Sequence, residues 1–137
     1  MNRKAIIENV HKTISDCRQV SFAYLHGSFV TGSSFKDIDI AIHINPKSYE
    51  YLSQQGETTL GFIIPVEREL ENILPYPVDI QLLNAAPLTF RHRVIRSGKL
   101  IVDNDPNLRS DFESLTRVEY FDFSPRRQEY LREALMG

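Results

Sequence analysis

The stretch Asp37-Ile38-Asp39-Ile40-Ala41-Ile42-His43-Ile44 decides the fold, because every second residue in it is an isoleucine. A β-strand points successive side chains to opposite faces, so this alternation predicts a strand with its isoleucines buried. The two aspartates and His43 then share the opposite face. Asn45-Pro46 follows directly and is expected to end the strand.

Three further strands are predicted around this one. Residues 78–83 alternate in the same way, with Asp79 and Gln81 on one face and apolar residues on the other. Residues 20–25 form a short run that is rich in aromatic and apolar residues and stops before Gly27. Residues 98–102 resemble a fourth strand. The sequence therefore predicts one small sheet.

Helical patterns lie between and after these strands. Apolar residues spaced by three and four predict helices at 3–17, at 48–74 with an interruption near 54–59, and at 86–96. Two more helices are expected at 106–117 and 125–136, each beginning with a proline. We predict a single α/β (α+β) domain over residues 1–137: a mixed sheet of about four strands, helices mainly on one face, and a C-terminal helical extension from about 104.

Composition excludes several classes of protein. Sixteen Lys and Arg against eighteen Asp and Glu give a net charge of -2, which argues against an extended nucleic-acid groove. Cys17 is the only cysteine, so no internal disulfide or thiolate metal cluster can form. No stretch approaches the roughly 20 apolar residues that span a bilayer. We expect a cytoplasmic protein with no membrane partner.

The acidic residues on the strand faces predict a metal site. Asp37 and Asp39 can both reach one hard cation, and Mg²⁺ prefers such oxygen ligands. If the strand that carries Asp79 lies beside theirs, a third carboxylate joins the same face. Three acids around two Mg²⁺ ions form the clamp used in nucleotidyl transfer. The alternative is that these acids only form the solvent-exposed face of an edge strand and bind no metal ion.

The segment before the aspartates favours a metal site over this alternative. Gly27 and Ser28 leave the preceding strand, and Gly32 and Ser33 follow in a turn of small residues. Glycine lets a phosphate approach the backbone, and free amides at a helix start bind anions. We therefore expect Gly27, Ser28, Gly32 and Ser33 to bind a nucleotide beside the metal ions.

This combination of Gly27-Ser28, Asp37-x-Asp39 and a later Asp79 resembles the DNA polymerase beta superfamily of nucleotidyltransferases, and within it the minimal, MNT-type members. The resemblance covers about residues 20–83. It implies that Gly27 and Ser28 contact a triphosphate, that Asp37 and Asp39 bind two Mg²⁺ ions, and that Asp79 activates the acceptor hydroxyl. The catalytic residues would be these three aspartates, with ATP as the substrate.

Minimal members of this kind are typically paired with a HEPN-domain toxin. The resemblance implies an antitoxin that silences its partner by moving AMP onto a tyrosine of the toxin. Two alternatives stay open: an antitoxin or scaffold that acts by contact alone, and transfer to a small molecule. A homodimer is possible.

Several other residues are less specific. His43 could border the site, whereas His26 is more often a packed turn residue. The basic group of Arg91, Arg93, Arg96 and Lys99 could meet a triphosphate, an acidic partner or only solvent. Aromatic residues of the tail, such as Tyr120 and Phe121, could belong to the core or to a partner surface.

Overall fold

Four strands form one mixed sheet in the order β3-β2-β1-β4. The computed structural model describes residues 1–136, without the side chain of Ser124; Gly137, the end of the predicted extension, lies outside the described residues. In the sheet, β1 (Val20–His26) pairs antiparallel with both β2 (Ile38–Ile44) and β4 (Lys99–Asp103). Strand β3 (Val78–Leu82) pairs parallel with β2. The predicted mixed α/β class is confirmed.

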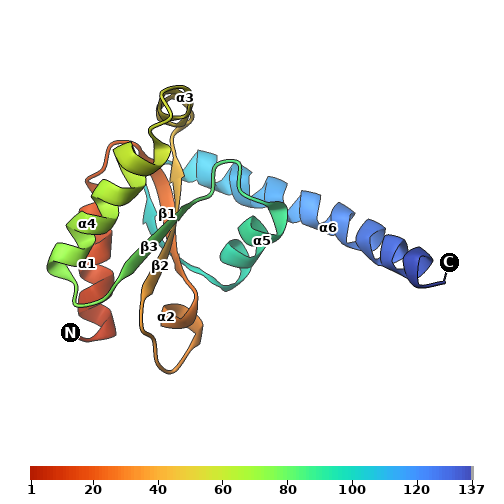
Figure 1. Ribbon diagram of the computed structural model, residues 1–137, viewed down its shortest axis with the longest axis horizontal. Helices are drawn as coiled ribbons and strands as arrows, with labels where there is room; N and C mark the ends of the chain where they lie inside the picture. Colours follow the sequence, from red (N-terminus) through yellow and green to blue (C-terminus); the bar gives the residue numbers. More distant parts are fainter. Residues whose placement is uncertain (137) are drawn as a thin grey trace.

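One face of the sheet is covered by α1 (Arg3–Ser15) and α4 (Ile64–Ile73), which lie side by side in Figure 1. The isoleucines of β2 are fully buried there, as their alternation predicts. The helices contribute apolar residues spaced by three or four. The main ones are Ile6, Val10 and Ile14 from α1, with Val66 and Leu70 from α4.

The parallel pair β2 and β3 requires a crossover, and this connection contains the predicted interruption. Helix α3 (Pro46–Gln54) ends before Gly56, whose φ of +67° lies in the left-handed region. A short π-helical turn, η1 (Thr59–Ile63), then leads into α4. Pro65 lies in the first turn of α4, where a missing N–H costs no helical hydrogen bond.

Helix α4 also protects the outer edge of β3. The carboxylate of Glu67 accepts a hydrogen bond from the Ile80 amide at 2.8 Å, and that of Glu71 accepts one from the Val78 amide at 3.0 Å. Without such protection, the free amides of an edge strand can pair with a strand of another chain. The two glutamates therefore fix β3 to α4 from the side.

The opposite face of the sheet is covered over part of its length by α5 (Leu88–Ser97) and the first turns of α6 (Pro106–Met136). Phe22, Tyr24 and Ala41 are buried there. They pack with Val94 of α5, and Phe22 also contacts Phe112 of α6. The rest of this face, at the end of β1, is left open.

Helix α6 corrects one prediction. Two helices were expected, at 106–117 and 125–136, but a single helix of 31 residues continues through Pro125. An interior proline removes one donor and strains the preceding turn, yet the remaining hydrogen bonds sustain this helix. Its second half projects away from the sheet (Figure 1) and exposes apolar side chains, including Phe121 (77% exposed) and Leu135 (88%). No helix within residues 1–136 is long and apolar enough to cross a membrane.

Candidate functional site

The open end of the sheet brings two acids and a histidine into one row. Asp39 pairs with His26 on one side and with Asp79 on the other, across three neighbouring strands. All three side chains lie on the face that α5 covers only in part. The expected neighbourhood of Asp39 and Asp79 is therefore present in the structure.

Asp37 lies just before β2 and is exposed, whereas Asp39 is half-buried. Burial raises the pKa of Asp39, and the charge of Asp37 raises it further. The His26 ring acts in the opposite direction, while Asp79 also raises this pKa. Carboxylates that disfavour one another's charge are a suitable setting for a cation, which would relieve their repulsion.

Gly27 allows the backbone to pass directly beside Asp39. Its φ of +73° favours glycine, and a Cβ atom at this position would collide with the Asp39 carboxylate. Helix α2 (Ser28–Thr31) begins at the next residue. The Thr31 hydroxyl donates a hydrogen bond to the Gly27 carbonyl at 3.1 Å. Both conformation and space therefore require a glycine here.

The turn after α2 is held by Arg3 of α1. The Arg3 guanidinium donates to the carbonyls of Phe29 at 3.4 Å and Gly32 at 3.1 Å. It also lies 4.9 Å from the ring centre of Phe35. A Cβ atom on Gly32 would come within 2.9 Å of the Ser28 carbonyl oxygen, so this glycine is needed for the turn itself.

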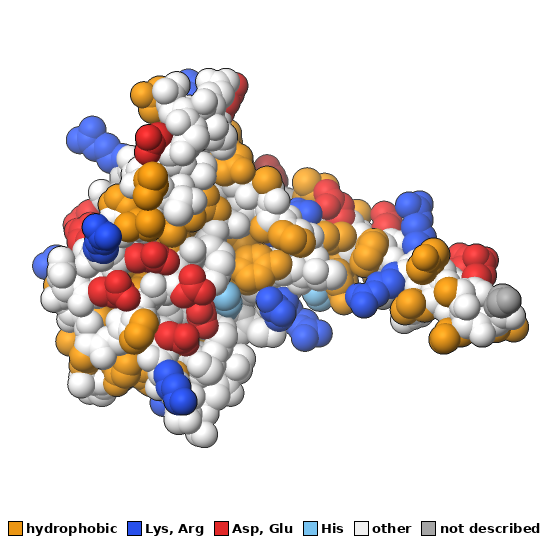
Figure 2. Space-filling model, viewed as in Figure 1, with side chains coloured by type: hydrophobic (Ala, Val, Ile, Leu, Met, Phe, Trp, Pro, Cys, Tyr) orange, Lys and Arg blue, Asp and Glu red, His pale blue; other side chains and the backbone are white. Residues whose placement is uncertain are grey.

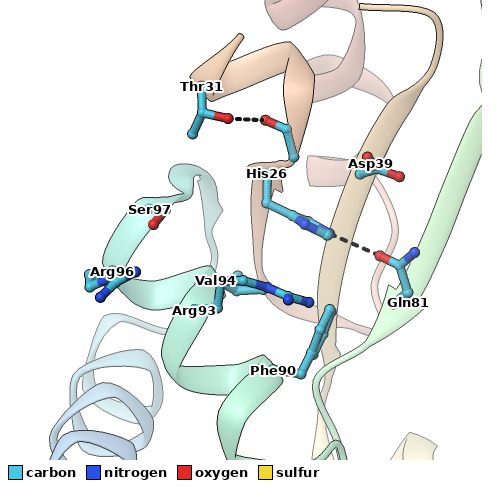
Figure 3. A pocket seen from close by; sticks show the side chains of 10 residues that line it. His26, Thr31, Asp39, Gln81, Phe90, Arg93, Val94, Arg96 and Ser97 are labelled. Atoms are coloured by element: carbon cyan, nitrogen blue, oxygen red, sulfur yellow. Dashed lines mark hydrogen bonds between the residues drawn. The ribbon is translucent and has the colours of Figure 1, made fainter.

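A cavity of about 400 Å³ opens between this row and α5, and Figure 3 shows the side chains around it. Gly27 and Asp39 line it, whereas Ser28 at the start of α2 and Gly32 and Ser33 in the following turn are exposed beside it. The remaining walls come from β1, α2, β3 and α5, through His26, Thr31, Gln81, Phe90, Arg93, Val94, Arg96 and Ser97.

The basic group divides in the structure. Arg93 and Arg96 line the cavity, and the Arg93 guanidinium lies 5.6 Å from the ring centre of Phe90. Arg91 instead forms an ion pair with Glu119 of α6 at 3.3 Å. Lys99 lies exposed on β4. Two cations thus face the cavity that contains Asp39.

Gln81 is a residue that sequence reasoning left without a role. Its side chain receives a hydrogen bond from His26 and donates one to the Asp79 carboxylate. As these side chains stand, no three acidic, histidine or cysteine side chains within residues 1–136 are grouped tightly enough to hold a metal ion. The strand alternation, which places Gln81 on the same face as Asp79, could have identified Gln81 as a residue of the site.

His43 is separate from this site. It is only 8% exposed and stacks on Phe22 with ring centres 4.6 Å apart. Burial lowers the pKa of His43 to about 4. Although it shares a face with Asp39, α6 covers it, so the structure does not place it in the cavity.

Comparison with known proteins points to one family. The sequence profile described as Polymerase beta, Nucleotidyltransferase matches residues 8–107. No curated protein matches the sequence. Among solved structures, the chain is similar to one described as a tri-AMPylated Shewanella oneidensis HEPN toxin in complex with MNT antitoxin, with 20% identity and a TM-score of 0.69 over 98% of this chain and 99% of that one.

Two other structures share the fold to a similar degree. A toxin–antitoxin with AMP-PNP gives 21% identity and a TM-score of 0.66, covering 98% of this chain and 99% of that one. A toxin–antitoxin MntA-HepT structure gives 17% identity and a TM-score of 0.65, covering 96% and 98%. At these identities the likeness concerns the fold, and the expected nucleotidyltransferase fold is confirmed.

Proposed function

Because the chain belongs to the polymerase beta nucleotidyltransferase family, we propose that it transfers AMP from ATP to a hydroxyl of a protein partner. The acceptor in this proposal is a tyrosine of a HEPN-domain toxin, which the transfer silences. The observation that carries the proposal is the row of Asp39 and Asp79, in register on adjacent strands and beside Gly27.

The acids fit Mg²⁺ by their chemistry. Asp37, Asp39 and Asp79 supply carboxylate oxygens. The pKa of Asp39 is raised by burial first and then by the charges of Asp37 and Asp79, and a bound cation would offset these effects. We propose that Asp37 and Asp39 hold two Mg²⁺ ions and that Asp79 joins them. When bound, the ions stabilise negative charge on the attacking and leaving oxygens.

In the proposed reaction, the acceptor oxygen attacks the α-phosphorus of ATP. The bond from this phosphorus to the oxygen bridging to the β-phosphorus breaks, and pyrophosphate leaves. The Asp79 carboxylate receives the proton of the acceptor hydroxyl. Asp79 is exposed, so a protein partner can bring its hydroxyl to it.

The cavity beside Asp39 suits the nucleotide. Arg93 and Arg96 offer positive charge to the phosphates, and Phe90 offers an apolar wall. Gly27 lines this cavity, and Ser28 at the start of α2 and Gly32 and Ser33 in the turn that follows are exposed beside it. This arrangement supports the predicted nucleotide-binding residues, with Gly27 nearest to the cavity.

The proposed partner draws on the matched structures, whose descriptions name a HEPN toxin and AMPylation. The projecting half of α6 supports a protein partner, because it exposes Phe121, Leu131 and Leu135. A reaction that consumes ATP to silence such a toxin belongs in the cytoplasm, and we propose that location. The expected homodimer stays a prediction.

Transfer of label from α-labelled ATP tests this proposal. The chain is incubated with Mg²⁺ and a HEPN-domain toxin, and compared with Asp37→Asn/Asp39→Asn. A matched control, Glu8→Gln/Asp16→Asn, removes the same charge from exposed positions on or next to α1. We expect label on the toxin with the parent and the control but not with the site variant. Label that persists in the site variant contradicts the proposal.

A contact-only antitoxin is the second candidate, and the exposed apolar surface of α6 is the observation that favours it. In that case Asp37→Asn/Asp39→Asn neutralises the toxin as well as the parent does. Phe121→Ala/Leu135→Ala would then abolish neutralisation. The opposite pattern supports the enzyme.

A further inference from the structure

We infer that His26 and Gln81 form a hydrogen-bonded chain that holds the Asp79 carboxylate in position for catalysis. The inference rests on the proposed function, because it assigns a positioning role toward the residue proposed to accept the proton. It concerns two residues that the family resemblance gave no role. They would act through Asp79 rather than on the substrate.

The chain runs across the open end of the sheet. His26 ends β1, and its Nε2 lies 2.9 Å from Oε1 of Gln81 on β3, spanning the strand that carries Asp39 (Figure 3). Gln81 Nε2 in turn donates to Oδ2 of Asp79, two residues earlier on the same strand. The two contacts use both ends of one amide group.

The direction of these hydrogen bonds follows from the groups themselves. An ionised carboxylate only accepts, so the Gln81 group that faces Asp79 must be its NH₂. The amide oxygen then faces His26, and His26 must donate from Nε2. Every group in the chain has a single role, which defines both the orientation of the amide and the proton on the ring.

The surroundings make this orientation useful. Asp79 is exposed and would otherwise rotate freely, whereas His26 and Gln81 are both half-buried. The His26 ring meets Phe90 edge to face, with ring centres 5.6 Å apart. The chain therefore links the exposed carboxylate to a packed ring. It engages Oδ2 and leaves Oδ1 of Asp79 for the cation and the acceptor proton.

Two matched pairs of variants test the chain by steady-state transfer of AMP. Gln81→Leu removes both hydrogen bonds, and Gln54→Leu is its control, since it breaks a 3.4 Å bond to Glu50 on exposed α3. His26→Phe keeps the ring but removes the donor, whereas His26→Gln places an NH₂ near the position of Nε2. Circular dichroism melts check that each variant is folded.

We expect Gln81→Leu and His26→Phe each to lower kcat by about 10- to 100-fold, the usual effect of losing a partner of a metal-site ligand. KM for ATP should change less than kcat, because the proposed role of the chain is to orient Asp79 toward the acceptor hydroxyl during the reaction step. His26→Gln should retain most of kcat, and Gln54→Leu all of it. Since both residues act through one carboxylate, the double variant should be no slower than Gln81→Leu alone.

Other outcomes overturn the inference. If folded Gln81→Leu is as fast as the parent or faster, the amide does not position Asp79 for catalysis. If KM for ATP rises while kcat is unchanged, Gln81 contacts the nucleotide instead. If the two losses multiply in the double variant, the residues do not act as one chain.

A readout without metal or substrate separates this inference from the proposed function. Long-range ¹H–¹⁵N NMR spectra at one fixed pH should show the His26 proton on Nε2, and Gln81→Leu should shift that signal while Gln54→Leu does not. An unshifted signal overturns the chain even if AMP transfer is observed. If the parent transfers no AMP, the proposed function fails, and the shift alone then decides whether the chain exists.

Discussion

One face of the sheet contains two regions that differ sharply, although the same strands build both. Toward the end of β1, His26, Asp39 and Asp79 are exposed or half-buried and lie in register on three neighbouring strands. Further along, Phe22 and His43 lie under α5 and α6. Strand alternation alone makes these residues equivalent. The helix that covers a position, rather than the strand that carries it, decides whether the position serves chemistry or stability.

The largest effect should come from Asp39→Asn in the open region. We expect at least about 1,000-fold slower AMP transfer, since losing about 4 kcal/mol of transition-state stabilisation has that effect. The variant should also melt at a higher temperature than the parent at pH 7. The pKa of Asp39 is raised by folding, so the ionised carboxylate destabilises the fold once the pH exceeds that pKa. Transfer assays and thermal melts measure both; a lower melting temperature would contradict the electrostatic account.

In the covered region, Phe22→Ala should destabilise the fold by about 3–5 kcal/mol, because it empties a fully buried position. Phe121→Ala is the matched control on the projecting part of α6, where the same ring is 77% exposed, and should change stability by less than about 0.5 kcal/mol. Urea unfolding measures both. Equal effects at the two positions would mean that the projecting part of α6 is packed.

His43 predicts a pH dependence of stability in the covered region. Folding lowers the pKa of His43 from 6.5 to about 4. Between these two values, His43 is protonated in the unfolded chain but neutral in the folded protein. Stability should therefore fall as pH drops from about 6.5 to 4, by about 2–3 kcal/mol from this group. His43→Phe keeps the stacking on Phe22 and should remove that part of the loss. Urea unfolding of parent and variant at pH 7 and pH 4.5 should diverge at the lower pH; parallel curves would contradict the role of His43.

The smallest effect concerns the edge of β3, which carries Asp79. Glu67→Met removes the acceptor of the Ile80 amide and should cost about 1 kcal/mol. Glu67→Gln keeps an oxygen there and should cost less. Hydrogen exchange of the Ile80 amide reports the change directly. Equal exchange rates in the two variants would show that the carboxylate does not protect this amide.

The strands were predictable because their signal is local. Alternation in β2 and β3 identified the buried face and brought Asp39 and Asp79 together once the strands were neighbours. The sequence predicted Gly27 as a site residue because glycine lets a phosphate approach the backbone. The structure adds a second reason, since the Asp39 carboxylate leaves no room for a Cβ atom there.

The remaining features depend on contacts between distant segments. The separation of His43 from the site requires α6, whose first turns lie about 70 residues further along the chain. The chain of His26 and Gln81 spans strands that are not sequence neighbours. Pro125 predicted the start of a second helix, yet one helix runs through it from Pro106, because the local preference of one residue did not outweigh its neighbours.

The topology has a consequence for how the protein is made. Strand β1 is the second element synthesised, but its partner β4 ends only at Asp103. At roughly 5–20 residues per second, translation from His26 to Asp103 takes about 4–15 s. Throughout that interval one edge of β1 has no partner, while the acidic residues of β2 and β3 have already left the ribosome or are leaving it. The nascent chain thus carries Asp39 and Asp79 before the strand order around them is complete, and during that interval the free edge of β1 can be shielded only by a molecule that binds the emerging chain.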